Sequence, residues 1–159
     1  MTTINNVTRL LDARRIPYTA HVLPPEKLGA LEVAQIMGVP PGQVYKTIVV
    51  RREKPGKPIL AVVPGPASVD LKALSLFLGD KKVYLPTERE AEGLTGLQAG
   101  GISPLALINR GFQVVIDSAA QEYKQIYISG GQRGLNIELP VDALADLTGA
   151  SFGKISRNE

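Results

Sequence analysis

The side chains that most often carry nucleophilic or metal chemistry are nearly absent from this chain. Its 159 residues include no cysteine and one histidine, His21. Disulfides, thiolate metal ligands and a cysteine nucleophile are therefore excluded, and so is a multi-histidine metal site. A Ser-His-Asp triad is possible only through His21, although a lone histidine on a strand is more often a surface or core residue. We expect no metal site, and His21 remains a candidate site residue.

One lysine is distinguished by its apolar neighbours. Residues 44–50, Val-Tyr-Lys-Thr-Ile-Val-Val, are largely β-branched and contain no Gly or Pro, which predicts a largely buried strand. Because alternate residues of a strand share a face, Lys46 lies beside Ile48 and Val50. A charge is costly to bury alone, so its ammonium is expected either to meet an anion in a cleft or to reach water at the end of an apolar stem.

Two glycine-rich segments, each containing a serine, are the other candidates. The first includes Gly100 and Gly101 and leads into Ile-Ser-Pro, and the second is Ser-Gly-Gly-Gln-Arg-Gly at 129–134. Dense glycines allow unusual dihedral angles and close backbone approach, and backbone N–H groups can then hold a carbonyl or a developing oxyanion. Ordinary turn chemistry explains these segments equally well. With Lys46, they favour a site that works by positioning rather than by a strong acid or nucleophile.

Several standard sites are excluded by their spacing. The sequence has no GxxxxGK[ST] or GxGxxG phosphate loop, no HExxH metal motif and no GxSxG nucleophile turn. Residues 32–39 resemble the first half of a DNA-binding helix-turn-helix. Pro40-Pro41-Gly42 and a strand follow where the recognition helix should begin, so no DNA partner is expected.

Composition and charge indicate an ordinary globular protein. Hydrophobic residues make up 44% of the chain, charged residues 21%, and the formal net charge is +3. This predicts one domain over residues 1–159, with a mildly basic character that is compatible with a nucleic-acid partner. The N-terminal residues show neither a basic signal region nor a long apolar run, so no membrane contact and a cytoplasmic location are expected.

The elements that must position these residues are helices and strands that do not strictly alternate. Helices are expected near residues 3–15 and 28–37, after a Ser68 cap as far as Leu78, after the capping box Thr87–Glu90, and between Pro140 and Gly149. Strands are expected at 18–22, 44–50, 59–63, 82–85, 114–117, 126–129 and 135–139. The 44–63 region reads as a hairpin with a basic tip. The mixture predicts an α+β fold with a largely antiparallel sheet.

Four motifs together resemble a known family. Residues 43–47, 100–105, 116–122 and 128–135 are similar, in order and spacing, to the YbaK-type aminoacyl-tRNA deacylases, and the resemblance runs from about residue 8 to 157. It implies a single-domain mixed sheet or barrel with surrounding helices, related to the editing domain inserted in bacterial prolyl-tRNA synthetases. It also implies hydrolysis in trans of the ester that joins a wrong amino acid to tRNA, with no metal or organic cofactor.

The resemblance assigns roles to individual residues. Lys46 would hold the tRNA 3′ end and orient the ester, and the loop of Gly101 and Ser103 would bind the aminoacyl carbonyl through its backbone. These are the candidate catalytic residues. The candidate substrate-binding residues are Tyr45, Gly100, Ile102, Pro104, Ser129, Gly130, Gly131, Asn136 and His21. The nucleophile would be water, or a thiol of the substrate itself with the tRNA hydroxyls assisting.

Two departures from the cysteine-specific members affect the predicted substrate. Those members carry a tyrosine near the position of Leu23 or Pro24, and an aspartate where this chain has Asn136. Cys-tRNA(Pro) is the first expectation, with alanine or serine esters as alternatives.

A tRNA 3′-end binding module with weak or no hydrolysis is the rival function. The expected partners are tRNA and, transiently, prolyl-tRNA synthetase. Candidate phosphate contacts are Arg51, Arg52, Lys54, Lys57, Lys81, Lys82 and Arg133.

Overall fold

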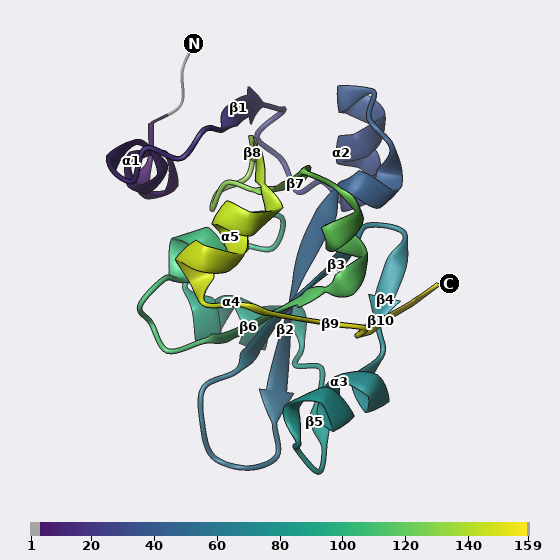
Figure 1. The fold of residues 1–159 in the computed structure, drawn as a ribbon. Helices are drawn as coiled ribbons and strands as arrows, with labels where there is room; N and C mark the ends of the chain where they lie inside the picture. The colour runs from purple at the N-terminus through teal and green to yellow at the C-terminus, as the bar shows by residue number, and fades with distance from the viewer. Residues whose placement is uncertain (1–3, 159) are drawn as a thin grey trace.

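The computed structural model describes residues 4–158, in which helices and strands are interleaved along the chain (Figure 1). The α-helices are α1 (Asn6–Ala13), α2 (Ala30–Met37), α3 (Leu71–Leu78), α4 (Glu88–Thr95) and α5 (Val141–Thr148). Short 3-10 turns are η1 (Pro41–Gln43), η2 (Pro104–Leu107) and η3 (Ser118–Glu122). The strands are β1 (Thr19–Val22), β2 (Tyr45–Arg52), β3 (Ile59–Pro64), β4 (Ala67–Val69), β5 (Val83–Tyr84), β6 (Gln113–Asp117), β7 (Gln125–Ser129), β8 (Leu135–Pro140), β9 (Ser151–Gly153) and β10 (Ser156–Asn158).

The strands form three sheets. The largest has the order β5-β2-β3-β6-β9, a second has the order β1-β8-β7, and β4 pairs with β10. Five of the strand pairs are antiparallel, and the β3–β6 and β6–β9 pairs are parallel. The α+β class and the largely antiparallel sheet are therefore confirmed, whereas the sheets of the described chain do not close into a barrel.

Strand β2 lies between two parts of the core. Tyr45 and Val49 pack in the larger cluster with β7, β8 and α5, whereas Val50 belongs to a second cluster, against which Ile48 also packs. The second cluster includes Leu74 of α3. In Figure 1, α3 and β5 lie at the bottom of the molecule and α2 at the top. Alternate side chains of β2 thus point to different sides of the sheet, which decides where Lys46 can act.

Several local predictions are confirmed. The 44–63 region is the expected hairpin, with Lys46 opposite Val63. Gly38 ends α2 and Gly149 ends α5, both in the left-handed conformation that glycine adopts without a Cβ penalty. Thr87 caps α4 through the expected capping box, in which its hydroxyl accepts the Glu90 N–H.

Other local predictions are wrong. Ser68 does not cap a helix, because it lies in β4 opposite Arg157 of β10. Asp70 is the cap of α3 instead, and its Oδ1 accepts the Ala73 N–H at 3.0 Å. Part of α3 is not buried, since Leu76 is 74% exposed. The first helix begins after Asn5 and ends at Ala13, so it is shorter than predicted, and its expected start at residue 3 lies outside the described residues.

The described residues contain no helix long and apolar enough to span a membrane. Within the same residues, no group of three or more histidine or carboxylate side chains is arranged to hold a metal ion.

Candidate functional site

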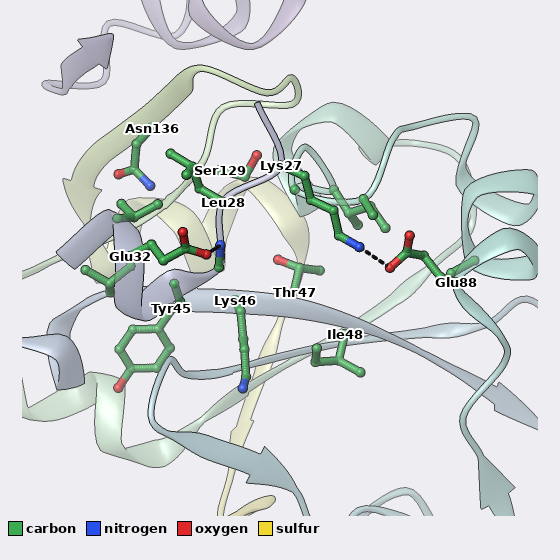
Figure 2. Close-up of a pocket in the computed structure, with 18 of the residues that line it drawn as sticks. Lys27, Leu28, Glu32, Tyr45, Lys46, Thr47, Ile48, Glu88, Ser129 and Asn136 are labelled. Atoms are coloured by element: carbon green, nitrogen blue, oxygen red, sulfur yellow. Dashed lines mark hydrogen bonds and ion pairs between the residues drawn. The ribbon is translucent and has the colours of Figure 1, made fainter. Parts of the chain in front are cut away.

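A cavity of about 580 Å³ opens along β2 and is lined by segments far apart in the sequence. Its walls come from the 23–30 loop with the first turns of α2, from β2, from the 85–91 segment, from residues 99–102 and from the adjoining ends of β7 and β8. Figure 2 shows several of these residues around the start of β2. We call this space the first cavity. An isolated parallel bridge between Val44 and Tyr127 brings the ends of β2 and β7 together beside it.

Lys46 lies at the edge of the first cavity and is half-buried. Figure 2 shows Lys46 and Ile48 on one side of β2 and Thr47 on the other, the side of Leu28 and Ser129. The Nζ of Lys46 donates a hydrogen bond to the Gly65 carbonyl oxygen at 3.1 Å. An ammonium has three N–H donors, so two remain for a ligand, given that the described residues supply this one acceptor. The partner found is therefore a backbone carbonyl rather than the expected anion or water. Two N–H donors of Lys46 are left for an anion.

The two glycine-rich segments pack against each other. A Cβ added to Gly101 would lie 2.9 Å from the Cα of Gln132, which only a glycine can avoid. The Gly101 N–H donates to the Gln98 carbonyl at 2.8 Å, so this N–H is already used within the loop. Gly100, with φ +89°, and Ile102 line the first cavity, but Gly101 does not. Gly101 thus sets the close approach that holds its neighbours at the cavity wall.

Ser103 and Pro104 lie beneath the cavity wall and do not line it. Ser103 is fully buried, and its Oγ accepts the Leu105 N–H at 3.2 Å at the start of η2. Pro104 opens η2 at its first position, where its missing N–H costs no hydrogen bond. In this structure both residues support the loop, and binding of the aminoacyl carbonyl by the loop backbone stays a prediction.

The second glycine-rich segment forms the β7–β8 turn. Ser129 lines the first cavity, and its Oγ accepts the Gly131 N–H at 3.3 Å. A Cβ on Gly130 would lie 2.5 Å from Cγ of Leu135, and Gly131 has φ +92°. These two glycines allow the tight turn and do not line the cavity, so Ser129 is the member of the predicted Ser-Gly-Gly set that reaches it.

Asn136 also lines the first cavity, from β8. It pairs in register with Ser129 of β7 and with His21 of β1. The residue is only 4% exposed, and its Oδ1 accepts no hydrogen bond from the described residues. A buried amide oxygen without a donor is costly unless something else supplies one. Asn136 therefore brings to the cavity wall an enclosed amide oxygen without a partner among the described residues, and a ligand reaches this oxygen only after the amide rotates.

His21 is held outside the cavity. Its Nε2 lies 3.0 Å from Oε1 of Glu138, and its ring centroid lies 5.8 Å from that of Tyr127. Burial raises the pKa of Tyr127, and the neighbouring Glu138 carboxylate raises it further. The three side chains form a polar group on the β1-β8-β7 sheet, and His21 does not line the first cavity.

Tyr45 lies at the start of β2 with its hydroxyl buried. The hydroxyl has no hydrogen-bond partner among the described residues. Burial raises the pKa of the Tyr45 phenol, and the Asp117 carboxylate raises it further. Asp117 itself accepts the N–H groups of Ala119, Ile155 and Ser156, so it is a structural carboxylate. Tyr45 contributes to the cavity wall, but its hydroxyl is enclosed in the core.

The decisive comparison is with a protein family. The family described as "Aminoacyl-tRNA editing domain" matches residues 24–147, which is most of the chain and spans every wall of the first cavity. The chain belongs to the aminoacyl-tRNA editing domain family. The predicted resemblance and the enzyme class, an aminoacyl-tRNA deacylase, are thereby confirmed. The extent of one editing domain over residues 1–159 stays a prediction.

Named relatives agree with membership of the editing domain family. The chain is 34% identical over 156 residues to EbsC of Enterococcus faecalis, named for Cys-tRNA(Pro)/Cys-tRNA(Cys) deacylase activity, and the match covers 97% of this chain and 94% of that protein. It is 24% identical over 153 residues to proline–tRNA ligase of Fervidobacterium nodosum, where the match covers 84% of this chain and 26% of the ligase.

Solved structures confirm the fold of this editing domain protein. The crystal structure of the hypothetical protein APE2540 has a TM-score of 0.87 at 25% identity, and the match covers 96% of this chain and all (100%) of that one. A structure described as a trans-editing enzyme for prolyl-tRNA synthetase has a TM-score of 0.80 at 24% identity, and the match covers 99% of this chain and 100% of that one.

Sequence reasoning missed several residues of the editing domain cavity. Lys27 and Glu88 form an ion pair at 2.6 Å, drawn as a dashed line in Figure 2, between the 23–30 loop and α4. Glu32 lines the cavity, and its Oε1 accepts the Gly29 N–H at 3.1 Å. The Gly-x-x-Glu spacing of a capping box was the one signal that could have located Glu32. Lys27 and Glu88 gave no signal, because only the tertiary fold brings them together.

Proposed function

We propose that this protein hydrolyses mischarged aminoacyl-tRNA in trans, with the aminoacyl ester in the first cavity and Cys-tRNA(Pro) as the first candidate substrate. The observation that carries the proposal is Lys46, a half-buried cation at the cavity edge with two N–H donors beyond its bond to Gly65. The membership in the editing domain family and the deacylase name of the EbsC relative support it.

The reaction is an ester hydrolysis. Water adds to the ester carbonyl, the bond from that carbon to the ribose oxygen breaks, and the amino acid leaves as a carboxylic acid while the ribose oxygen regains a proton. Lys46 would hold the negatively charged tRNA end so that the ester lies against the glycine-rich wall.

The carboxylates at the cavity are poorly placed to serve as a general base. Glu32 accepts the Gly29 N–H, and Glu88 is paired with Lys27. Glu26 also lines the cavity, and all three carboxylates are exposed at the rim rather than enclosed. Proton transfer would therefore come from the substrate, through the free ribose hydroxyl beside the ester or through a substrate thiol, as the resemblance implies. This accounts for a site without cysteine, with its histidine outside the cavity.

Asn136 would contribute to substrate choice. Its buried Oδ1 can accept a hydrogen bond from an ammonium, hydroxyl or thiol of the aminoacyl group. A neutral amide attracts an ammonium less strongly than a carboxylate would, so Asn136 does not select cysteine by charge. Small side chains differ in binding by only about 1–3 kcal/mol. Cysteine, alanine and serine esters are accordingly the substrates to compare.

A second candidate is a tRNA 3′-end binding module with weak hydrolysis. Its support is that the Gly101 N–H is used within its loop and that Ser103 is fully buried. Both observations count against the predicted binding of the aminoacyl carbonyl by the backbone of this loop. The similarity to proline–tRNA ligases supports tRNA(Pro) as the bound tRNA and a transient prolyl-tRNA synthetase partner.

The test is deacylation of Cys-tRNA(Pro), Ala-tRNA(Pro) and Ser-tRNA(Pro) by the wild-type protein and by Lys46→Ala. Selective loss of one ester, abolished in the variant, would establish editing and name the amino acid. Turnover that is equal in the variant would remove Lys46 from the mechanism. Binding of tRNA without hydrolysis of any of the three esters would favour the binding module.

A further inference from the structure

A second cavity lies beside the first, on the side of β2 toward which Lys46 points. Its volume is about 390 Å³, and it shares Lys46, Ile48 and Leu85 with the first cavity. The remaining wall comes from β4, the start of α3 and β10, namely Ser68, Val69, Asp70, Leu71, Lys72 and Arg157. The pairing of β10 with β4 places Arg157 opposite Ser68 at this wall. The two cavities thus adjoin at the Lys46 side chain.

The charge of the second cavity is positive. Its lining contains Lys46, Lys72 and Arg157 and one carboxylate, Asp70. Asp70 is occupied as the cap of α3, where its Oδ1 accepts the Ala73 N–H. Lys72 and Arg157 are exposed, and neither forms an ion pair within residues 4–158. Two unpaired cations and the free donors of Lys46 therefore surround one space.

The basic tip of the β2–β3 hairpin, which contains several of the candidate phosphate contacts, is different. Asp80 is within 3.3 Å of Arg52 and 2.7 Å of Lys54, and Arg51 lies 3.5 Å from Glu90. Carboxylates of the protein thus pair with these three cations, with Asp80 shared by Arg52 and Lys54, whereas Lys57 lies over the Phe112 ring. The hairpin is therefore the weaker of the two sites for a phosphate, and the second cavity is the stronger.

We propose that the second cavity binds the nucleotide that precedes the terminal adenosine of tRNA, with Lys72 and Arg157 against its phosphate. This rests on the proposed function. A cavity of about 580 Å³ is the size that accommodates a drug-sized molecule, which an aminoacyl-adenosine is. The phosphodiester that links this nucleotide to the terminal adenosine would cross at Lys46, and the apolar wall of Ile48, Val69 and Leu71 would pack against the base of the preceding nucleotide.

The first test is binding of uncharged tRNA, which does not depend on hydrolysis. The variants are Lys72→Gln, Arg157→Gln and the double variant. Lys124→Gln is the control, because Lys124 is exposed and lines neither cavity. Each protein is titrated at several salt concentrations with intact tRNA and with tRNA shortened by its last two nucleotides.

The double variant is expected to bind intact tRNA about tenfold more weakly than the control. The slope of log affinity against log salt should fall by about 1 for each phosphate that a removed cation no longer neutralises. Its affinity for shortened tRNA should equal that of the control. The inference is wrong if the variants match Lys124→Gln on intact tRNA, or if their affinity for the shortened tRNA is weakened by as much.

Kinetics separate the subsite from the reaction. Arg157→Gln is expected to raise KM for charged tRNA about three- to tenfold with kcat unchanged. The same variant should hydrolyse an aminoacyl-adenosine ester, which has no preceding nucleotide, at the wild-type rate. An equal loss of hydrolysis rate on that small ester would contradict the proposal that Arg157 binds the preceding nucleotide. If the wild-type protein hydrolyses neither substrate, the proposed function fails, while the binding comparison still decides the subsite.

Discussion

The two faces of strand β2 present different chemistry, although their residues alternate within one short run. On the Thr47 face, the first cavity is built from glycine-rich backbone, Ser129 and a buried amide, Asn136. On the Lys46 face, the second cavity is built from apolar side chains rimmed by Lys72 and Arg157. The first face suits a small neutral group held by shape and hydrogen bonds. The second suits an anion.

This difference indicates how a protein without a strong nucleophile can act on a charged polymer. The substrate has an ester at one end of its terminal nucleotide and a phosphate at the other. A strand with alternating faces can hold the two ends on opposite sides, with Lys46 at the boundary. The following predictions test whether the two faces are separable, beginning with the largest effect.

Replacing Gly101 with alanine should damage the first cavity most. The new Cβ would lie 2.9 Å from the Gln132 backbone, and neither loop can shift without moving the other. We expect a loss of stability of about 2–3 kcal/mol and a large loss of deacylation. The control is Gly93→Ala in α4, where nothing lies within 4 Å of the added Cβ, and which should stabilise by about 0.5–1 kcal/mol. Urea unfolding measures the free energy of unfolding of both variants. Equal values would contradict the close packing of Gly101 against Gln132.

Replacing Asn136 with leucine should separate stability from function. The change removes a buried oxygen that has no donor among the described residues, so stability is expected to rise by about 1–2 kcal/mol. Deacylation should fall about tenfold through KM, because the substrate loses its acceptor. Thermal unfolding and steady-state kinetics on the same preparation check both. A destabilised variant with full activity would show that Asn136 is a structural residue.

Replacing Thr87 with alanine should loosen the outer rim of the first cavity. Thr87 caps α4, and losing such a cap costs about 1 kcal/mol. Hydrogen bonds that the Thr87 backbone N–H and side chain donate to the carboxylate lower the pKa of Glu90. A lowered pKa means that the ionised carboxylate stabilises the folded state, and this contribution is lost as the pH falls through that pKa. NMR titration of Glu90 should show its pKa rising in Thr87→Ala, and an unchanged pKa would exclude the cap as its cause.

Replacing Tyr45 with phenylalanine should have the smallest effect. The hydroxyl is buried without a partner among the described residues, so activity should stay within about twofold and stability within about 0.5 kcal/mol at neutral pH. Because burial raises the pKa of the phenol, the wild-type protein should lose stability as the pH rises above about 10, where the unfolded chain ionises first. Tyr45→Phe should lose less over that range. A strong loss of activity would place this hydroxyl in the reaction.

Local signals predicted most of the fold. The hairpin around 44–63, the Gly38 and Gly149 helix ends and the Thr87 capping box depend on residues adjacent in sequence, so the sequence alone was enough. The β4–β10 pair was missed because its strands are about ninety residues apart and only three residues long. That pairing also explains why Ser68 was mistaken for a helix cap.

The candidate site was predicted unevenly for the same reason. Strand periodicity and the family motifs pointed to Lys46, Ser129 and Asn136, which line the first cavity, and their roles stay predictions. Ser103 and His21 do not line it, since burial and a Glu138 partner depend on the packing of distant strands. Lys72 and Arg157 carried no motif. Their importance follows only from their position at the second cavity and from the absence of an ion pair to either of them among the described residues.

The most direct test of the role of β2 is single-turnover deacylation of Cys-tRNA(Pro) at saturating protein, with Lys46→Ala beside Arg157→Gln. If β2 divides the ester from the phosphate and Lys46 joins them, Lys46→Ala should lose at least about 100-fold in the first-order rate and bind tRNA more weakly. Arg157→Gln should lose only affinity. A wild-type rate for Lys46→Ala on saturating substrate would contradict the central claim that Lys46 orients the ester.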